Sequence, residues 1–205
     1  MKDYTELLKK LLASPSLEEP SNFDLDNEES NIARTEEFIH KSTVIRTFNG
    51  GLLKLYRYTA KDLGNIFLVD TKTGRSTYFM EYMIEYLPVL KHKSAAFQTL
   101  VWVSKESPRP RRGFAADIVI RYLIRQCHFV ISDQGQTSDG KRFWHNLLRI
   151  AYSAGYEIGL LDLRVSNRIK CVGDFDEWYE SVSYAYSYQS SEHYRYRFYI
   201  ESHIG

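Results

Sequence analysis

A change of pattern near residue 100 is the feature that most constrains the fold of this chain. Before it, short strands are predicted at 44–48, 52–58, 65–70 and 76–87, and Asn49-Gly50-Gly51 between the first two is typical of a tight hairpin. After it, predicted strands alternate with helices whose apolar residues recur with helical spacing. Hairpins join antiparallel strands, whereas strand–helix alternation indicates crossover connections. The sequence therefore predicts an α+β fold with a mixed, mostly antiparallel sheet flanked by helices.

The second half of the chain shows a regular alternation of predicted elements. Residues 99–103 are nearly all apolar, as expected of a strand that is buried on both faces. The elements after it are a helix at 115–123, a strand at 128–132, a helix from Thr137 or Ser138 to a stop at Gly155, a strand at 158–163, a helix at 174–186 and a final edge strand at 194–200.

Charge and proline set the first 42 residues apart from the rest. Residues 1–42 hold 5 basic and 10 acidic side chains, and Pro15 and Pro20 follow a short amphipathic run. We interpret residues 1–42 as an N-terminal helix and acidic arm, and residues 43–205 as the folded domain. An unstructured, solvated tail is the alternative. The negative charge of the arm also raises the hypothesis that it folds over a basic loop near residue 110.

The overall composition limits the classes of function. The 27 basic residues nearly balance the 26 acidic ones, which argues against nucleic acid as a partner. No window approaches the roughly 18 apolar residues of a membrane span, and the N-terminus lacks the apolar run of a signal peptide. Cys127 and Cys171 are too few for a disulfide framework and indicate a reducing compartment. We expect a cytoplasmic protein without a membrane partner, and homodimerisation stays open.

The segment between the strand at 99–103 and the next helix predicts an anion site. Arg109, Arg111 and Arg112 stand immediately before the step Gly113-Phe114-Ala115-Ala116. Exposed amides at a helix N-terminus, small residues that allow close approach and nearby arginines together favour binding of a pyrophosphate. A solvated basic turn that ends in glycine is the alternative.

The element order and this loop resemble the GNAT superfamily of acyl-CoA-dependent N-acyltransferases. In that fold an antiparallel group leads into a central strand, a pyrophosphate loop, a helix, a strand, a second helix and closing strands. The loop pattern is Arg or Gln, two residues, Gly, one residue, then Gly or Ala; Gly113 and Ala115 match it, whereas Pro110 occupies its first position. The resemblance covers about residues 43–200, and the stretch 132–144 is most similar to GNAT-like proteins encoded by bacteriophages.

The resemblance implies acetyl-CoA as co-substrate and an amine as acceptor. The backbone N–H at the splayed strand end, near Val103, would meet the thioester carbonyl. The general acid would be Tyr152, although the family's tyrosine position falls on Ala151. Asp133, at the end of its strand, is the candidate base, with a turn aspartate as the alternative. The residues predicted to hold the pyrophosphate are Arg109, Arg111, Arg112, Gly113, Phe114, Ala115 and Ala116.

Other interpretations stay open beside the enzyme. Pro110 and Ala151 favour a catalytically inactive GNAT-like protein that binds a partner, which for a phage protein would be a host or virion component in the host cytoplasm. The run 135–141 resembles the phosphate loop of nucleotide hydrolases, with Asp162 on a magnesium-binding strand, but Arg142 replaces the required hydroxyl residue. The alternating Tyr and Arg residues at 194–199 could stack on nucleic-acid bases. An edge strand with one solvent-exposed face explains the same alternation equally well. No metal site is expected.

Overall fold

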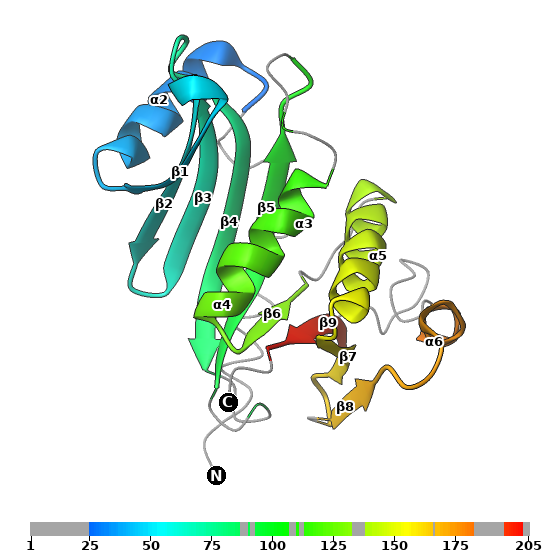
Figure 1. Ribbon diagram of the computed structural model, residues 1–205. Coiled ribbons are helices and arrows are strands. Elements are labelled where there is room, and N and C mark those ends of the chain that lie inside the picture. The colour runs from blue at the N-terminus through cyan, green and yellow to red at the C-terminus, as the bar shows by residue number, and fades with distance from the viewer. Residues whose placement is uncertain are drawn as a thin grey trace. The chain divides into compact units, whose positions relative to one another are not determined.

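The computed structural model describes residues 25–86, 90, 93–106, 110, 113–132, 138–165, 167–182 and 195–202. The chain is α+β, with a large and mostly antiparallel sheet, as the sequence predicts (Figure 1). The described residues fall into two compact units. The first unit comprises 25–59, 65–80 and 102–106, and the second comprises 60–64, 81–101 and the described residues from 110 onward. No helix among the described residues is both long enough and apolar enough to cross a membrane.

The first unit is built on a hairpin. Helix α2 (Glu28–Ile39) precedes β1 (Thr43–Phe48), and the 3-10 turn η1 (Asn49–Gly51) leads into β2 (Leu53–Ala60). β1 pairs antiparallel with β2, which confirms the predicted hairpin. Asn49 and the two glycines after it take positive φ angles of 49°, 63° and 100°, a backbone conformation that these residue types tolerate. Two further strands belong to this unit only in part. The unit contains residues 65–70 of β3 (Leu63–Asp70) and residues 76–80 of β4 (Ser76–Tyr86).

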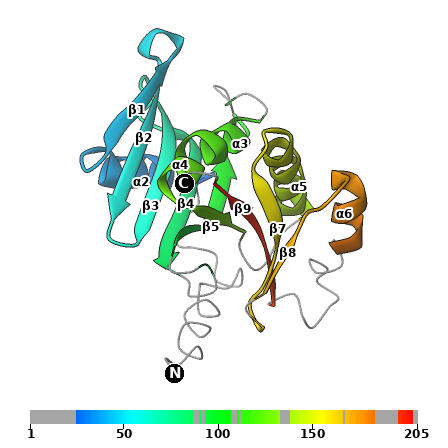
Figure 2. The same ribbon diagram turned by 60° about the horizontal axis from the view of Figure 1, so that its bottom comes forward.

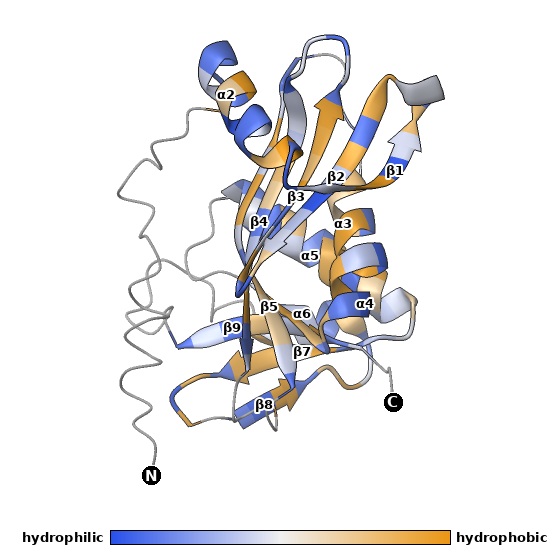
Figure 3. Ribbon diagram, turned by 90° about the vertical axis from the view of Figure 1, so that its left-hand side faces the viewer, coloured by the Kyte–Doolittle hydropathy of each residue, from blue (hydrophilic) through white to orange (hydrophobic). Residues whose placement is uncertain are grey.

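Aromatic packing and one buried amide hold α2 in the first unit. The ring centroid of Phe38 lies 5.0 Å from that of Tyr58 and 6.3 Å from that of Phe79. Asn31 is fully buried; its amide donates to the Leu25 and Ser76 carbonyls and its oxygen accepts from the Ser76 N–H, at 2.8 to 3.0 Å. Figure 3 shows hydrophobic and hydrophilic residues alternating along α2, as in an amphipathic helix. The segment 1–42 therefore ends in a packed helix, and residues 1–24 lie outside the described residues.

The second unit contains a strand–helix–strand–helix–strand order. Its strands pair in the order β5-β6-β9-β7-β8, with β5 and β6 parallel and the other neighbours antiparallel (Figure 2). All three helices predicted in this half are present, and the second stops before Gly155, whose φ is 83°. The elements are β5 (Ser94–Val103, of which 94–101 belong here), α3 (Phe114–Ile118), a π-helical segment (Val119–Leu123), α4 (Ile124–Gln126), β6 (Phe129–Ile131), α5 (Ser138–Ser153), β7 (Glu157–Asp162), β8 (Asn167–Lys170), α6 (Phe175–Val182) and β9 (Tyr196–Glu201).

Two strand predictions were wrong. β9 is an interior strand rather than a final edge strand, because it pairs with both β6 and β7 while β8 forms the edge. Arg197 and Tyr199 are consequently 2% and 0% exposed, so the Tyr/Arg alternation does not present these side chains to a nucleic acid. The strand at 99–103 is also not buried on both faces. The buried part of β5 is Ala95 to Gln98, and Val103 is 43% exposed.

Candidate cofactor-binding site

The predicted anion site lies at the start of α3. Gly113 has a φ of 82° and precedes the helix, and the first backbone hydrogen bond of the helix runs from the Asp117 N–H to the Gly113 carbonyl at 3.0 Å. The amides of the residues between them therefore have no acceptor within the helix. A Cβ atom placed on Gly113 would meet nothing within 4 Å. The backbone conformation, rather than crowding, explains the glycine, and the space beside the helix start is open.

The helix that begins at Gly113 is anchored along its length. α3, the π-helical segment and α4 follow one another without a break from Phe114 to Gln126. Ile118, Val119, Leu123 and Ile124 are each no more than 2% exposed. Figure 1 shows this helix lying across one face of β5 and β6. A π-helical turn is uncommon and is often found at functional sites.

Strands β5 and β6 part shortly after they pair. Their parallel register runs only from Ala95 with Phe129 to Phe97 with Ile131. β6 then ends, and Ser132 turns to β9: its N–H donates to the Phe198 carbonyl at 3.0 Å and its hydroxyl oxygen accepts from the Phe198 N–H at 3.1 Å. β5 continues for six more residues beyond Phe97 without a partner residue in β6. Beyond Phe97 the described part of β6 therefore supplies no hydrogen-bond partner to this edge of β5.

The structure brings part of the predicted pyrophosphate set together at the helix start. Phe114 and Ala116 are buried against the unit, whereas Gly113 is exposed and Ala115 is half-buried. Val103 ends β5, within the first unit. The residues of this prediction that lie outside the described residues are Arg109, Arg111 and Arg112.

Tyr152, the predicted general acid, points toward the loop before α6. Its hydroxyl donates to the Gly173 carbonyl at 2.5 Å, and its ring centroid lies 5.9 Å from that of Phe175. Ala151, which occupies the family's tyrosine position, is fully buried. Asp133, the predicted base, lies outside the described residues.

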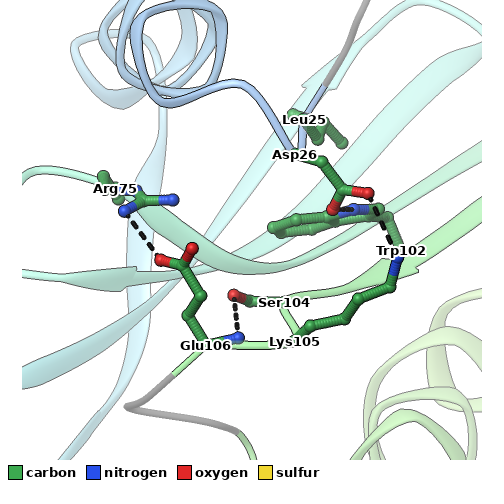
Figure 4. A pocket seen from close by; sticks show the side chains of 7 residues that line it. All are labelled: Leu25, Asp26, Arg75, Trp102, Ser104, Lys105 and Glu106. Carbon is green, nitrogen blue, oxygen red and sulfur yellow. Dashed lines mark hydrogen bonds and ion pairs between the residues drawn. The ribbon is translucent and has the colours of Figure 1, made fainter.

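A polar cavity of about 260 Å³ lies in the first unit, at the end of β5 (Figure 4). The Asp26 carboxylate accepts from the Trp102 indole N–H at 3.1 Å and lies 3.5 Å from the Lys105 ammonium. Arg75 pairs with Glu106 at 3.0 Å and with Glu28 at 3.5 Å. Sequence reasoning missed this cluster because its members are far apart in the chain and no motif links them. The full lining is Leu25, Asp26, Arg75, Trp102, Ser104, Lys105 and Glu106.

These contacts bear on the hypothesis that the acidic arm covers the basic loop. Asp26 and Glu28, at the end of the segment 1–42, contact Lys105 and Arg75. Lys105 lies shortly after β5, whereas the basic residues of the hypothesis, Arg109, Arg111 and Arg112, lie outside the described residues. The side chains of Asp26 and Lys105 are 55% and 83% exposed, so this ion pair contributes little stability in water.

The structure argues against the part of the nucleotide-hydrolase interpretation in which Asp162 holds Mg²⁺. Asp162 is 4% exposed, and both its carboxylate oxygens accept hydrogen bonds from Arg195 at 2.8 Å or less. A carboxylate committed to a guanidinium is not free to hold Mg²⁺. Most of the loop at 135–141 lies outside the described residues.

Metal-binding and thiol chemistry find no support among the described residues. They contain no group of three or more His, Cys, Asp or Glu side chains with the geometry of a metal site. Cys127 and Cys171 are free thiols. Burial raises the pKa of Cys127 to about 11, so its thiol stays protonated and unreactive at neutral pH.

No protein-family model matches the chain, and no curated protein matches its sequence. Membership of the GNAT superfamily therefore stays a prediction from the element order and from the loop at Gly113. The structural features that bear on it are the start of α3, the parting of β5 and β6, and the surroundings of Tyr152.

Proposed function

We propose that this chain is an acyl-CoA-dependent N-acyltransferase with a GNAT-like fold, transferring an acetyl group to an amine. The observation that carries the proposal is the parting of β5 and β6 after Phe97 and Ile131, within the unit whose helix starts at Gly113. Beyond Phe97 the backbone of β5 would offer N–H and C=O groups to the amides and the thioester carbonyl of acetyl-CoA. The order of strands and helices around this opening also matches the one expected of the superfamily.

The start of α3 suits the pyrophosphate of the same ligand. The backbone amides of its first turn and the positive end of the helix dipole favour an anion. Asp117, in the first turn, would oppose a phosphate, but its carboxylate lies 3.9 Å from the Arg121 guanidinium, four residues on. The ion pair reduces that repulsion. Among the described residues, no atom lies within 4 Å of a Cβ atom placed on Gly113, which favours room for the ligand there.

The proposed reaction needs few groups from the protein. The amine nitrogen bonds to the thioester carbonyl carbon, the C–S bond breaks, and the thiolate takes a proton while the nitrogen loses one. A backbone N–H of β5 would stabilise the oxyanion that forms in between. Tyr152 can supply the proton only by giving up its hydrogen bond to Gly173. That hydrogen bond favours the second candidate function, a catalytically inactive GNAT-like protein that binds a partner.

Calorimetric titration with acetyl-CoA tests the proposal. We expect the wild type to bind and Gly113→Glu to lose at least about a hundredfold in affinity, because a carboxylate there repels the phosphates and fills their space. The matched control is Gly74→Glu, which adds the same charge at a similar φ of 74° with equally open surroundings. Both variants bear a similar backbone strain of about 1 kcal/mol, so a loss confined to Gly113→Glu reports on the site.

Release of free thiol from acetyl-CoA distinguishes the two candidate functions. An active transferase should release thiol faster when a polyamine or a lysine-containing peptide is added. Binding of acetyl-CoA without amine-dependent release would favour the inactive interaction protein. Absence of binding by the wild type would remove the enzyme proposal.

A further inference from the structure

Helix α6 is held in the second unit by side-chain contacts with α5 and β9 (Figure 2). Its apolar residues Phe175, Trp178 and Val182 are no more than 8% exposed. The ring centroids of Trp178 and Tyr179 lie 6.1 and 5.6 Å from that of Phe198 in β9. A helix of eight residues is too short to be stable by itself in water, so α6 depends on these contacts.

His145 lies in the contact between α5 and α6. The centroid of its ring is 4.5 Å from that of Tyr179 and 5.6 Å from that of Phe175. The Arg149 guanidinium lies 3.5 Å from the Nε2 atom of His145 and donates to the Asp176 carboxylate at 2.7 Å. One cation of α5 therefore contacts both this imidazole and the first turn of α6.

This arrangement suits the neutral imidazole. Arg149 can donate to Nε2 only while that nitrogen carries no proton. Protonation would place a second positive charge beside the guanidinium, against rings that keep water away from it. Burial and then Arg149 lower the pKa of His145 below its ordinary value, and they outweigh the opposite effects of Asp176 and Glu180 on α6.

We propose that His145 makes the docking of α6 sensitive to acid, because protonation of its ring loosens α6 from α5 and β9. A group whose pKa is lowered on docking binds its proton more weakly in the docked form than in the released form. Docking is therefore strongest above the ordinary histidine pKa of about 6.5 and weakens as the pH falls below it.

Tyr152 belongs to the same contact. Its hydroxyl donates to the Gly173 carbonyl before α6, and its ring packs against Phe175. Loosening of α6 removes this acceptor and exposes the aromatic face of the helix. The device requires no acyl transfer and would act equally in an inactive interaction protein.

Amide hydrogen exchange of α6 tests the proposal on the wild type, His145→Phe and His145→Gln. Phenylalanine keeps the aromatic contact and glutamine keeps an acceptor for Arg149, and neither can become charged. The sequence of α6 is the same in all three proteins, so the ratio of their exchange rates at one pH reports how often the helix opens. We expect wild-type α6 to exchange several-fold faster, relative to both variants, at about pH 5.5 than at about pH 7.5.

Two internal controls accompany this experiment. Helix α2, in the first unit, should show the same pH dependence in all three proteins. His40→Phe replaces an exposed histidine at the end of α2 and should leave the exchange of α6 as in the wild type. The same pH dependence of α6 exchange in the wild type and in both His145 variants would overturn the inference. Slower exchange of wild-type α6 at the lower pH would overturn it as well, because the charged ring would then favour docking.

Titration of the His145 imidazole by NMR supplies a second measurement. The midpoint should lie below about 6.5 in the wild type and should rise in Arg149→Gln, which removes the neighbouring cation. A wild-type midpoint above that value would show that the docked helix prefers the protonated ring and would contradict the proposal. Neither measurement involves acetyl-CoA, so the result is independent of the proposed function.

Discussion

Replacing Asp162 with asparagine should destabilise the second unit strongly. Asp162 ends β7, and its carboxylate accepts from Arg195, which precedes β9, and from the Arg164 and Val165 N–H groups at 3.0 and 3.4 Å. The side chains of Asp162 and Arg195 are 5% and 25% exposed. Removing one partner of a buried ion pair costs about 3 to 5 kcal/mol. Because Arg195 keeps some contact with water, we expect a loss near the lower end, about 3 kcal/mol of the free energy of unfolding.

The loss should depend on pH in a defined direction. Burial by itself raises the pKa of Asp162, but the hydrogen bonds from Arg195 and from the two backbone amides outweigh it and leave the pKa below its ordinary value. A lowered pKa in the folded state stabilises the protein above the pKa of the unfolded chain, about 3.9. That stabilisation is lost as the pH falls through the folded pKa. The difference between wild type and Asp162→Asn should therefore be full at pH 7 and shrink below about pH 4.

Urea unfolding at a series of pH values measures both quantities. The control is Asp139→Asn, since Asp139 pairs with Arg142 on the surface and its side chain is 84% exposed. Such a pair contributes at most about 1 kcal/mol. A loss below about 1 kcal/mol for Asp162→Asn at pH 7, or one that persists unchanged at low pH, would refute the assignment of Asp162 and Arg195 as a strongly stabilising buried ion pair.

Three further substitutions give distinct outcomes. Asn31→Leu removes three buried hydrogen bonds and leaves the Ser76 backbone unpaired, so chemical denaturation should show a loss of about 3 kcal/mol in the free energy of unfolding. A loss below about 1 kcal/mol would contradict the role of Asn31 in holding α2 against the first unit. Gly64→Ala places a Cβ 2.2 Å from the Tyr82 ring, so the melting temperature should fall, and an unchanged value would exclude that close packing. Asp26→Asn weakens the contacts of this side chain with the Trp102 indole and the Lys105 ammonium beside the cavity. If the acidic segment competes with an anion for the basic loop, the variant should bind acetyl-CoA more tightly at low salt. Unchanged affinity would dismiss that hypothesis.

Local signals explain why much of the fold was predictable. The hairpin at Asn49 follows from residues that accept positive φ, and the α5 stop follows from Gly155. Helical spacing of apolar residues located both α3 with its continuation and α5 within a few residues of their ends. Each of these signals lies within one element or one turn, so a single stretch of sequence contains all the information needed.

The candidate site was only partly predictable for the opposite reason. The start of α3 at Gly113 was expected, because a glycine before an apolar helical pattern is a local signal. The hydrogen bond of Tyr152 to Gly173 was not, because 21 residues separate the two partners. The polar cavity at Trp102 joins side chains from three separate stretches of chain, and the sequence contains no pattern that relates them.

By itself, the sequence determined the type and order of the strands and helices, since these depend on periodicity, caps and turn residues. Only the tertiary structure decided that β9 lies between β6 and β7 and that β6 ends three pairs into its contact with β5. Strand order and hydrogen-bond partners depend on which distant segments meet in space. A pattern with a period of a few residues carries no information about such pairings.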